Sequence, residues 1–250
     1  MPKINVYLPD DLAAAVKAAE IPVSAVCQKA LADAVQAVTL ARKGVALLRD
    51  PGFDPDARPE LAARLAGRMT DRLKASVELA HQAAGEGPVG TRHLLVGLID
   101  EGGNLGVRLL PALGEEPDAL REAALASTAE EPLPNATGAA GAAGGFWTGL
   151  TMPARSAIGA ALEAALDLGH NYIGCEHLLL GLLAEEQSGA GHLLAAAGLD
   201  AAAVRRAITT AMAGFAQARQ NTTPPGTESL LRQLAQRLDG IEHRLGAAGL

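Results

Sequence analysis

An internal repeat constrains this chain more than any other feature of its sequence. Residues Gly90–Ala124 align without a gap with Gly174–Ile208. The positions that are identical in the two copies, numbered in the first copy, are Gly90, His93, Leu94, Leu95, Gly97, Leu98, Glu101, Leu109, Leu110, Ala112, Gly114, Ala119, Arg121 and Ala123. In both copies the apolar residues recur at helical spacing. The sequence therefore predicts a duplicated helical domain.

Composition favours a mainly α-helical fold. Hydrophobic residues make up 49% of the chain but aromatic residues only 2%, and most of the apolar share is alanine and leucine, which favour helices. The net charge of −7 excludes a chain that is basic throughout but allows a local DNA-binding face. Cys27 and Cys175 form no Cys-x-x-Cys pair, no apolar run is long enough to span a membrane, and the N-terminus is too polar for a signal peptide. These features predict a cytoplasmic protein with two free thiols.

The first 40 or so residues predict a strand followed by two helices. Ile4, Val6 and Leu8 alternate with polar residues, as in a strand with one apolar face. The acidic pair Asp10–Asp11 suits the first turn of a helix, and Ser24 is expected to be the N-cap of the next helix. Such a unit is too small to bury a core alone, so a second chain is expected to pair with the strand.

This order of elements, from Lys3 to about Val38, resembles the ribbon–helix–helix fold of antitoxin-type repressors. The resemblance implies that two strands form a ribbon in the DNA major groove, with the outward side chains of Lys3, Asn5 and Tyr7 reading bases. Backbone N–H groups near Ser24 would hold a phosphate. The alternative is a strand that only dimerises and whose outer face is solvated.

Further along the chain, proline and glycine divide the segments. Residues 51–60 are expected to be a linker, and a helix is expected from about Leu61 to Ala84. The glycine-rich stretch Ala129–Gly149 lacks the strand and the Gly-Lys-Ser/Thr of a phosphate-binding loop, so it is expected to be a flexible linker.

The expected segments are 1–45 for the ribbon–helix–helix unit, 46–68 for a linker and helix, 69–128 for the first repeat, 129–149 for the flexible linker, 150–215 for the second repeat, 216–229 for a linker and 230–247 for a C-terminal amphipathic helix. The apolar spacing of that last helix fits a coiled-coil seam between two chains or a helix packed on its own chain.

The duplicated unit resembles the N-terminal repeat domain of Clp-family unfoldases, most closely the ClpC type. In the second copy the resemblance rests on "LGHNYIGCEHLLLGLL" and "LLAAAGLDAAAVRRAI", and in the first on "GTRHLLVGLIDEG" and "LLPALGEEPDALREA". It spans about Met69 to Phe215 and implies a pseudo-twofold pair of four-helix repeats. In that family the domain docks adaptors and substrates, including proteins marked by arginine phosphorylation, for the ATPase rings behind it.

No catalytic residue, cofactor or metal is expected in this chain. The sequence contains no Gly-x-x-x-x-Gly-Lys-Ser/Thr, no Gly-x-Ser-x-Gly and no His-Glu-x-x-His, so neither an ATPase nor a protease site is predicted. His93 and His177, one in each repeat, are interpreted as capping or core histidines rather than metal ligands. Cys175 lies beside a helix start, which can lower the pKa of a thiol, but structural packing is the favoured interpretation.

The resemblance singles out Glu176 as a ligand-binding residue. The family's phosphoarginine site uses a glutamate in each Gly-x-Glu-His motif, and its carboxylate can take a guanidinium through two charge-assisted hydrogen bonds. Glu176 keeps that position in the second copy. Arg92 replaces it in the first copy and would favour a phosphate or a carboxylate instead. A carboxylate in the first turn of a helix is also stabilising without a ligand, and this simpler interpretation of Glu176 stays open.

Two functions fit these features. The first is a homodimeric transcriptional regulator that binds an operator, for example in its own promoter, and whose Clp-type domain senses a protein, a phosphoarginine-type ligand or a Clp-directed cyclic peptide. The second is an adaptor or decoy of the Clp machinery, in which the N-terminal segment serves only to dimerise. The two are compatible, and both predict a protein without enzymatic activity.

Overall fold

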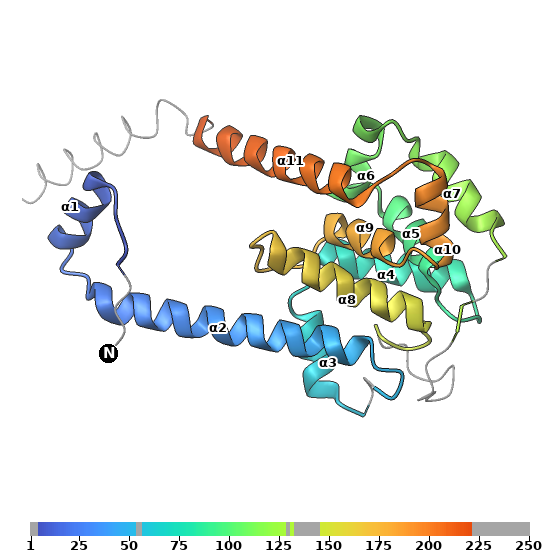
Figure 1. Cartoon of the computed structure of the whole chain (residues 1–250), viewed down its shortest axis with the longest axis horizontal. Helices are drawn as coiled ribbons and strands as arrows, with labels where there is room; N and C mark the ends of the chain where they lie inside the picture. Colours follow the sequence, from blue (N-terminus) through green and yellow to red (C-terminus); the bar gives the residue numbers. More distant parts are fainter. Residues whose placement is uncertain (1–4, 54–56, 129–130, 133–145, 222–250) are drawn as a thin grey trace, which may run out of the picture. The chain divides into compact units, whose positions relative to one another are not determined.

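The computed structural model describes residues 5–53, 57–128, 131–132 and 146–221. The helices in chain order are α1 (Asp10–Ala18), α2 (Val23–Leu48), α3 (Pro59–Ala66), α4 (Asp71–Ala84), α5 (Thr91–Glu101), α6 (Leu105–Leu109), the 3₁₀ turn η1 (Pro111–Leu113), α7 (Pro117–Ala126), α8 (Met152–Asp167), α9 (Cys175–Ala184), α10 (Gly189–Ala196) and α11 (Ala201–Asn221) (Figure 1). Among the described residues β pairing is limited to two isolated bridges, so the mainly α fold class is confirmed. None of the helices in this part of the chain has both the length and the apolar character needed to cross a membrane. The described residues fall into two compact units, one ending at Asp200 and the other beginning at Ala201.

The part of the predicted N-terminal strand that the structure describes, residues 5–8, does not form a strand in the single chain. Asn5 and Tyr7 are exposed and lie outside any strand, and Lys3 lies outside the described residues. A strand needs a neighbour to complete its hydrogen bonds, and no described residue of the chain pairs with this segment. The predicted N-cap is also wrong, because α2 begins at Val23 with Pro22 as its N-cap and Ser24 lies within the first turn.

The second helix is much longer than the ribbon–helix–helix pattern predicts. α2 continues without a break to Leu48 and passes the expected segment boundary at residue 45. Its last turns bury Ala41, Val45 and Leu48, and the helix packs against α8. Arg49 adds an exposed ion pair with Glu163 at 3.3 Å. α2 therefore belongs in part to the expected N-terminal segment and in part to the core of the first unit.

The single helix expected over 61–84 is in fact two helices, α3 and α4. The chain leaves helical geometry at Gly67–Thr70 because Met69 pairs with Ile173 in one of the two bridges. Thr70 then caps α4, since its hydroxyl accepts a hydrogen bond from the N–H of Leu73 at 3.2 Å. A long-range pairing therefore overrides a helical pattern that is continuous in sequence.

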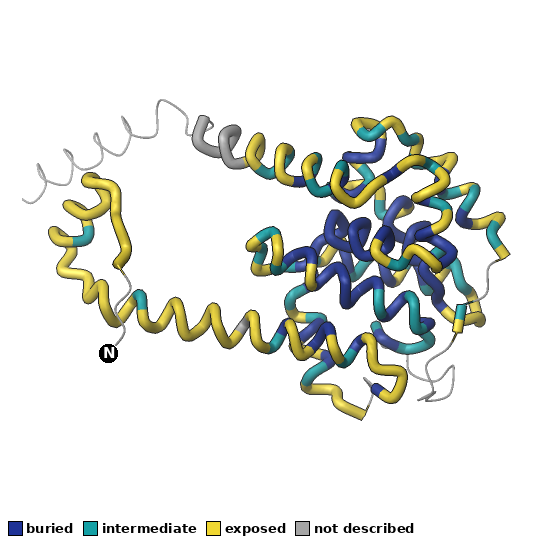
Figure 2. Tube along the Cα trace, in the orientation of Figure 1, coloured by how far each residue is buried: buried dark blue, intermediate teal, exposed yellow. Residues whose placement is uncertain are grey.

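The two copies of the repeat have the same order of helices. α5 and α9, α6 and α10, and α7 and α11 begin at equivalent positions of the alignment. Within the first unit α4 packs against α5, and α8 packs against α9. The fully buried leucines that follow each repeat histidine are Leu94, Leu95 and Leu98 in one copy and Leu178, Leu179 and Leu182 in the other. Figure 2 shows α9, one of the two helices that carry these leucines, almost entirely as buried.

A repeated glycine permits this packing. A Cβ atom at Gly97 in α5 would lie 2.0 Å from the carbonyl oxygen of Ser76 in α4. At the equivalent Gly181 in α9, a Cβ atom would lie 2.1 Å from the carbonyl oxygen of Ala157 in α8. Since neither position has room for a side chain, each helix pair approaches closely. The recurrence of this glycine in the sequence therefore has a steric cause.

The C-terminal amphipathic helix expected at 230–247 lies outside the described residues.

Candidate functional site

Two reciprocal backbone pairings join the repeats. Met69 pairs with Ile173, and Val89 pairs with Leu150. In the first pairing the N–H of Thr70 donates to the carbonyl of Ile173 at 2.9 Å, and in the second the N–H of Thr151 donates to the carbonyl of Val89 at 3.0 Å. Thr70 and Thr151 are the N-caps of α4 and α8. Each repeat therefore brings a helix cap beside the Gly-x-x-His turn of the other repeat.

The repeat histidines cap the helices on which they lie. The N–H of Gly90 donates to His93 Nδ1 at 3.0 Å, and the N–H of Gly174 donates to His177 Nδ1 at 2.9 Å. Both side chains are buried. In each copy the third residue of the helix thus satisfies a backbone donor that helix geometry leaves unpaired. The prediction of capping or core histidines is confirmed.

Glu176 is buried at the start of α9 rather than presented to solvent. Its side chain bends back over Gly174, where a Cβ atom would lie 2.4 and 2.6 Å from the two carboxylate oxygens. Burial raises the pKa of Glu176, while its own backbone N–H, the nearby His170 and a hydrogen bond from Tyr172 oppose this shift. The carboxylate stabilises the helix start. A guanidinium ligand would have to compete with these contacts.

His170 and Tyr172 surround His177 and were not anticipated as site residues. The rings of His170 and Tyr172 stack with their centroids 5.3 Å apart, and both meet His177 edge-on. His170 Nδ1 lies 2.8 Å from His177 Nε2. Because His177 Nδ1 accepts the Gly174 N–H, neutral His177 carries its proton on Nε2 and donates it to His170. The sequence contained a signal for this cluster, since both side chains lie in the short loop before Gly174.

One cluster among the described residues could in principle hold a metal ion. It consists of His170, Glu176 and His177, whose potential ligand atoms lie within 4.8 Å of one another. The hydrogen bonds oppose this use. Coordination through His177 Nε2 would displace its proton to Nδ1, and the cap on the Gly174 N–H would be lost. The short distance between Glu176 Oε1 and His177 Nδ1, 3.4 Å, is likewise no ion pair, because that nitrogen is an acceptor.

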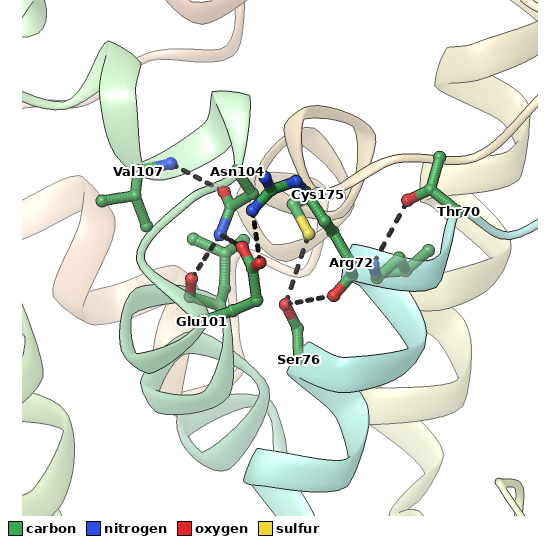
Figure 3. A network of polar contacts seen from close by, with 9 residues as sticks. Thr70, Arg72, Ser76, Glu101, Asn104, Val107 and Cys175 are labelled. Carbon is green, nitrogen blue, oxygen red and sulfur yellow. Dashed lines mark hydrogen bonds and ion pairs between the residues drawn. The ribbon is translucent and has the colours of Figure 1, made fainter.

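Cys175 is part of a polar network that fixes α9 against α4 (Figure 3). Its thiol lies 3.3 Å from the hydroxyl of Ser76, which also donates to the carbonyl of Arg72 at 2.9 Å. Burial raises the pKa of Cys175 to about 12, so the helix start does not activate the thiol and the packing interpretation is favoured. Beside it, Glu101 binds Arg72 at 2.6 Å and accepts from the Asn104 amide at 2.9 Å.

Arg92 faces a different set of partners in the first repeat. Its guanidinium donates to the carbonyl of Ser127 at 2.6 Å. Arg92, His93 and Ser127 line a pocket of about 570 Å³ together with the linker residue Glu131. Burial, followed by the positive charge of Arg92, lowers the pKa of His93, while Glu131 opposes the shift. The pocket of the first repeat therefore contains the positive charge of Arg92 at the position where the second repeat has Glu176.

Glu131 is a residue of this region that the sequence analysis did not single out. Its carboxylate accepts hydrogen bonds from the N–H and the hydroxyl of Thr91, from the hydroxyl of Thr151 and from the N–H of Gly189. The distances from Thr91 N, Thr151 Oγ1 and Gly189 N are 2.8, 2.7 and 3.1 Å. No local pattern marks a glutamate in a low-complexity linker as a site residue, because its partners are distant in sequence.

The sequence-predicted residues fall into two separate groups. Asn5, Tyr7 and Ser24 are exposed on the N-terminal segment, and the hydroxyl of Ser24 accepts only a long hydrogen bond, 3.4 Å, from Gln28 among the contacts described for it. Glu176 lies in the buried start of α9. Their roles in binding DNA and phosphoarginine stay predictions.

Comparison with known proteins agrees with the repeat domain. Residues 149–245 match the model of the Clp repeat (R) N-terminal domain. The chain is 26% identical over 182 residues to "Chaperone protein ClpB" of Oceanobacillus iheyensis and 27% identical over 177 residues to "Negative regulator of genetic competence ClpC/MecB" of Bacillus subtilis. Each alignment covers 67% of this chain and 21% of the relative. The chain thus spans about a fifth of the length of these relatives.

Two further similarities involve chloroplast and plant relatives. "Chaperone protein ClpC2, chloroplastic" of Oryza sativa is 33% identical over 144 residues, which cover 56% of this chain and 15% of the relative. The crystal structure of the N-terminal domain of the chaperone ClpD from Arabidopsis thaliana aligns with 58% of this chain and 95% of that domain, at 24% identity and a TM-score of 0.44. The family similarity thus concerns the sequence of residues 149–245, which is similar to the Clp repeat (R) N-terminal domain.

Proposed function

We propose that this chain is a cytoplasmic, non-enzymatic, dimeric regulator. Its Clp-type domain binds proteins, phosphoarginine-type ligands or Clp-directed small molecules, and its N-terminal segment binds DNA. The observation that carries the proposal is the exposed apolar surface of the N-terminal segment, together with a repeat domain that has its own buried core.

Most of the exposed large hydrophobic residues among the described ones lie between residues 6 and 38. They are Val6, Tyr7, Leu8, Leu12, Ile21, Val23, Val26, Leu31, Val35 and Val38, against Leu125 and Phe215 elsewhere. α1 buries no residue, and Figure 2 shows most of this segment as exposed. Apolar surface concentrated in this way marks an interaction site. A second copy of the chain is the natural partner, because it would also supply the neighbour that the unpaired Asn5–Leu8 segment needs.

Dimerisation is tested by changing this surface. Val26→Asp with Leu31→Asp is expected to convert a dimer into a monomer in sedimentation or light-scattering measurements on the full chain. Leu125→Asp is the matched control, because it places the same charge on an exposed leucine outside the segment. A wild-type chain that is monomeric at high micromolar concentration would contradict the dimer, and with it the ribbon.

DNA binding rests on the same dimer. Two paired N-terminal segments would present Asn5 and Tyr7, which is 91% exposed, from both chains on one ribbon, with Lys3 at its start. Fluorescence anisotropy with the DNA upstream of the protein's own gene is the test. Binding is expected to weaken as salt rises and to be lost specifically in Lys3→Ala with Asn5→Ala. Lys29→Ala is the control, because Lys29 is paired with Asp33 on α2.

The adaptor or decoy function is the second candidate, and the repeat domain favours it because its core includes the last turns of α2 but none of the exposed apolar residues between 6 and 38. For an adaptor, the dimer is expected to bind phosphoarginine, Clp adaptors or Clp-directed cyclic peptides but not to bind DNA specifically. Calorimetry with the full chain measures the binding of these ligands. Binding of these ligands without DNA binding would favour the adaptor. DNA binding that changes with the same ligands would favour the regulator.

A further inference from the structure

Two imidazole rings share one hydrogen bond beside the start of α9. His170 Nδ1 lies 2.8 Å from His177 Nε2, and the N–H of Gly174 donates to His177 Nδ1 at 2.9 Å. His177 is fully buried, whereas His170 is half-buried. Since His177 Nδ1 accepts the Gly174 N–H, the neutral ring of His177 donates through Nε2 and His170 Nδ1 accepts. The neutral pair therefore satisfies both hydrogen bonds.

An additional proton on this pair cannot be placed without the loss of one of these contacts. On His170 Nδ1 the proton would face the N–H of His177. On His177 Nδ1 it would face the N–H of Gly174. If His177 moved its own proton from Nε2 to Nδ1 in order to accept from a protonated His170, the helix cap would again be lost. Every protonated arrangement thus sets two donors against each other.

The charges around the pair favour His170 as the ring that takes the proton. Glu176 on α9 interacts electrostatically with His170, and Tyr172 of the same loop donates a hydrogen bond to Glu176. A nearby carboxylate favours a positively charged ring. Three further charged groups lie at the ends of neighbouring helices, namely Arg72 and Glu101, which pair with each other at 2.6 Å, and the exposed Asp167. Because His170 is also the less buried ring, it is the one that can turn toward solvent when it is charged.

The loop that carries His170 also holds one of the two pairings between the repeats. The N–H of Ile173 donates to the carbonyl of Arg68 at 2.8 Å, and the N–H of Thr70 donates to the carbonyl of Ile173 at 2.9 Å. We refer to these two hydrogen bonds as the Ile173 pairing. Ile173 directly precedes the glycine that His177 caps, so movement of the loop would be felt at this pairing.

The equivalent hydrogen bonds of the other repeat, which we call the Val89 pairing, stand beside a single imidazole. The N–H of Val89 donates to the carbonyl of Gly149 at 2.9 Å, and the N–H of Thr151 donates to the carbonyl of Val89 at 3.0 Å. The segment 85–88 that precedes them contains no histidine. His93 alone caps this turn, and burial lowers its pKa, so it stays neutral to a lower pH. The Val89 pairing is therefore an internal reference for the Ile173 pairing.

We propose that the His170–His177 pair is a pH-sensitive switch on the Ile173 pairing: uptake of one proton by His170 separates the two rings and loosens loop 169–174. The neutral pair holds Ile173 against the first repeat, and the protonated pair releases it. Because the closed loop binds fewer protons than the open loop, a fall in pH favours the open loop. This inference depends neither on DNA binding nor on dimerisation, so it can hold where the proposed function fails.

The test compares amide hydrogen exchange at the two pairings in the full chain, expressed as protection factors so that the intrinsic pH dependence of exchange is removed. The measurements are made at about pH 7.5 and about pH 5.5, on either side of the ordinary pKa of histidine. At the lower pH, protection at Ile173 and Thr70 should be at least about fivefold lower, the effect of one net hydrogen bond. Protection at Val89 and Thr151 should not fall with it.

Two variants assign the effect to His170. His170→Gln removes the titrating ring but keeps an acceptor for the N–H of His177, so protection at Ile173 should no longer depend on pH in this range. His192→Gln is the matched control, because it changes an exposed histidine on α10, and it should retain the wild-type response.

An equal response of the two pairings to pH in the wild type would overturn the proposal, as would a response at Ile173 that persists in His170→Gln. If His170→Gln does not fold, the ring nitrogen chemical shifts of the wild type decide. His170 should gain its proton over the pH range in which protection at Ile173 falls. A His170 that stays neutral over that range would refute the switch.

Discussion

Glu131 and Glu176 place their carboxylates over equivalent glycines, although one comes from a linker and the other from the first turn of a helix. The helix starts at Gly90 and Gly174 both retain a nearby negative charge, which the exposed N–H groups of a helix favour. In the first repeat Arg92 stands where the second repeat has Glu176, and the distant residue Glu131 supplies the negative charge instead. Both copies therefore place a carboxylate near the glycine at the helix start, although the aligned residues at this position differ in charge.

The glycines of the helix pairs should be intolerant of any side chain. Gly97→Ala and Gly181→Ala are each expected to lower the free energy of unfolding by about 1–3 kcal/mol or more, because the methyl group meets a backbone carbonyl of the facing helix. Gly214→Ala is the control, because no atom lies within 4 Å of a Cβ at this helical position, and it should stabilise the helix by about 0.5–1 kcal/mol. Urea denaturation measures all three. If Gly97→Ala did not lower the free energy of unfolding more than Gly214→Ala does, the close approach of α4 and α5 would be refuted.

Protonation of His93 should weaken the fold. Its pKa lies below the ordinary value of 6.5, chiefly because of burial, so the folded chain favours the neutral ring that accepts the Gly90 N–H. The stabilisation is complete above pH 6.5 and is lost as the pH falls through the lower pKa of the folded state. The free energy of unfolding, measured against pH, should therefore decrease in this range. His93→Leu should remove this component, whereas His192→Leu, at an exposed position, should retain it.

Cys175 should be inert in the folded protein. Burial raises the pKa of its thiol to about 12, so the reactive thiolate is scarce at neutral pH, and reagents cannot reach it. With a thiol reagent under native conditions, the half-buried Cys27 should react first and Cys175 only as the chain unfolds. Mass spectrometry of the labelled peptides distinguishes the two. Rapid native labelling of Cys175 would show that the start of α9 opens readily.

Glu176→Gln separates the two interpretations of this residue. If the carboxylate takes a guanidinium, phosphoarginine affinity measured by calorimetry should fall by at least about tenfold, because a charge-assisted bidentate contact is lost. Glu122→Gln serves as the control for a change of surface charge. Unchanged affinity with a reduced free energy of unfolding would instead identify Glu176 as a helix-stabilising residue, as its burial over Gly174 suggests.

The repeat could be predicted from the sequence because its causes are local. The glycine at positions 97 and 181 recurs because a facing backbone leaves it no room, and His93 and His177 recur because each caps the turn that precedes it. Both constraints act within a few residues or at one helix contact. Alignment of the two copies therefore locates the helices and the capping histidines correctly.

The failures have long-range causes. The helix expected over 61–84 breaks because Met69 pairs with Ile173, which lies in the other repeat. The end of α2 is misplaced because its last turns bury Val45 and Leu48 in a core that the N-terminal pattern does not reveal. Glu131 was missed because its donors come from three other segments, and a glutamate in a low-complexity linker looks like any solvated residue.

α2 has a mechanical consequence. As one uninterrupted helix of 26 residues, it is about 39 Å long at 1.5 Å per residue, and its last turns are anchored in the core beside α8. The exposed apolar residues Val26, Leu31 and Val35 therefore lie on the same continuous helix as the buried Val45 and Leu48. One helix thus connects the apolar N-terminal surface to the core of the first unit.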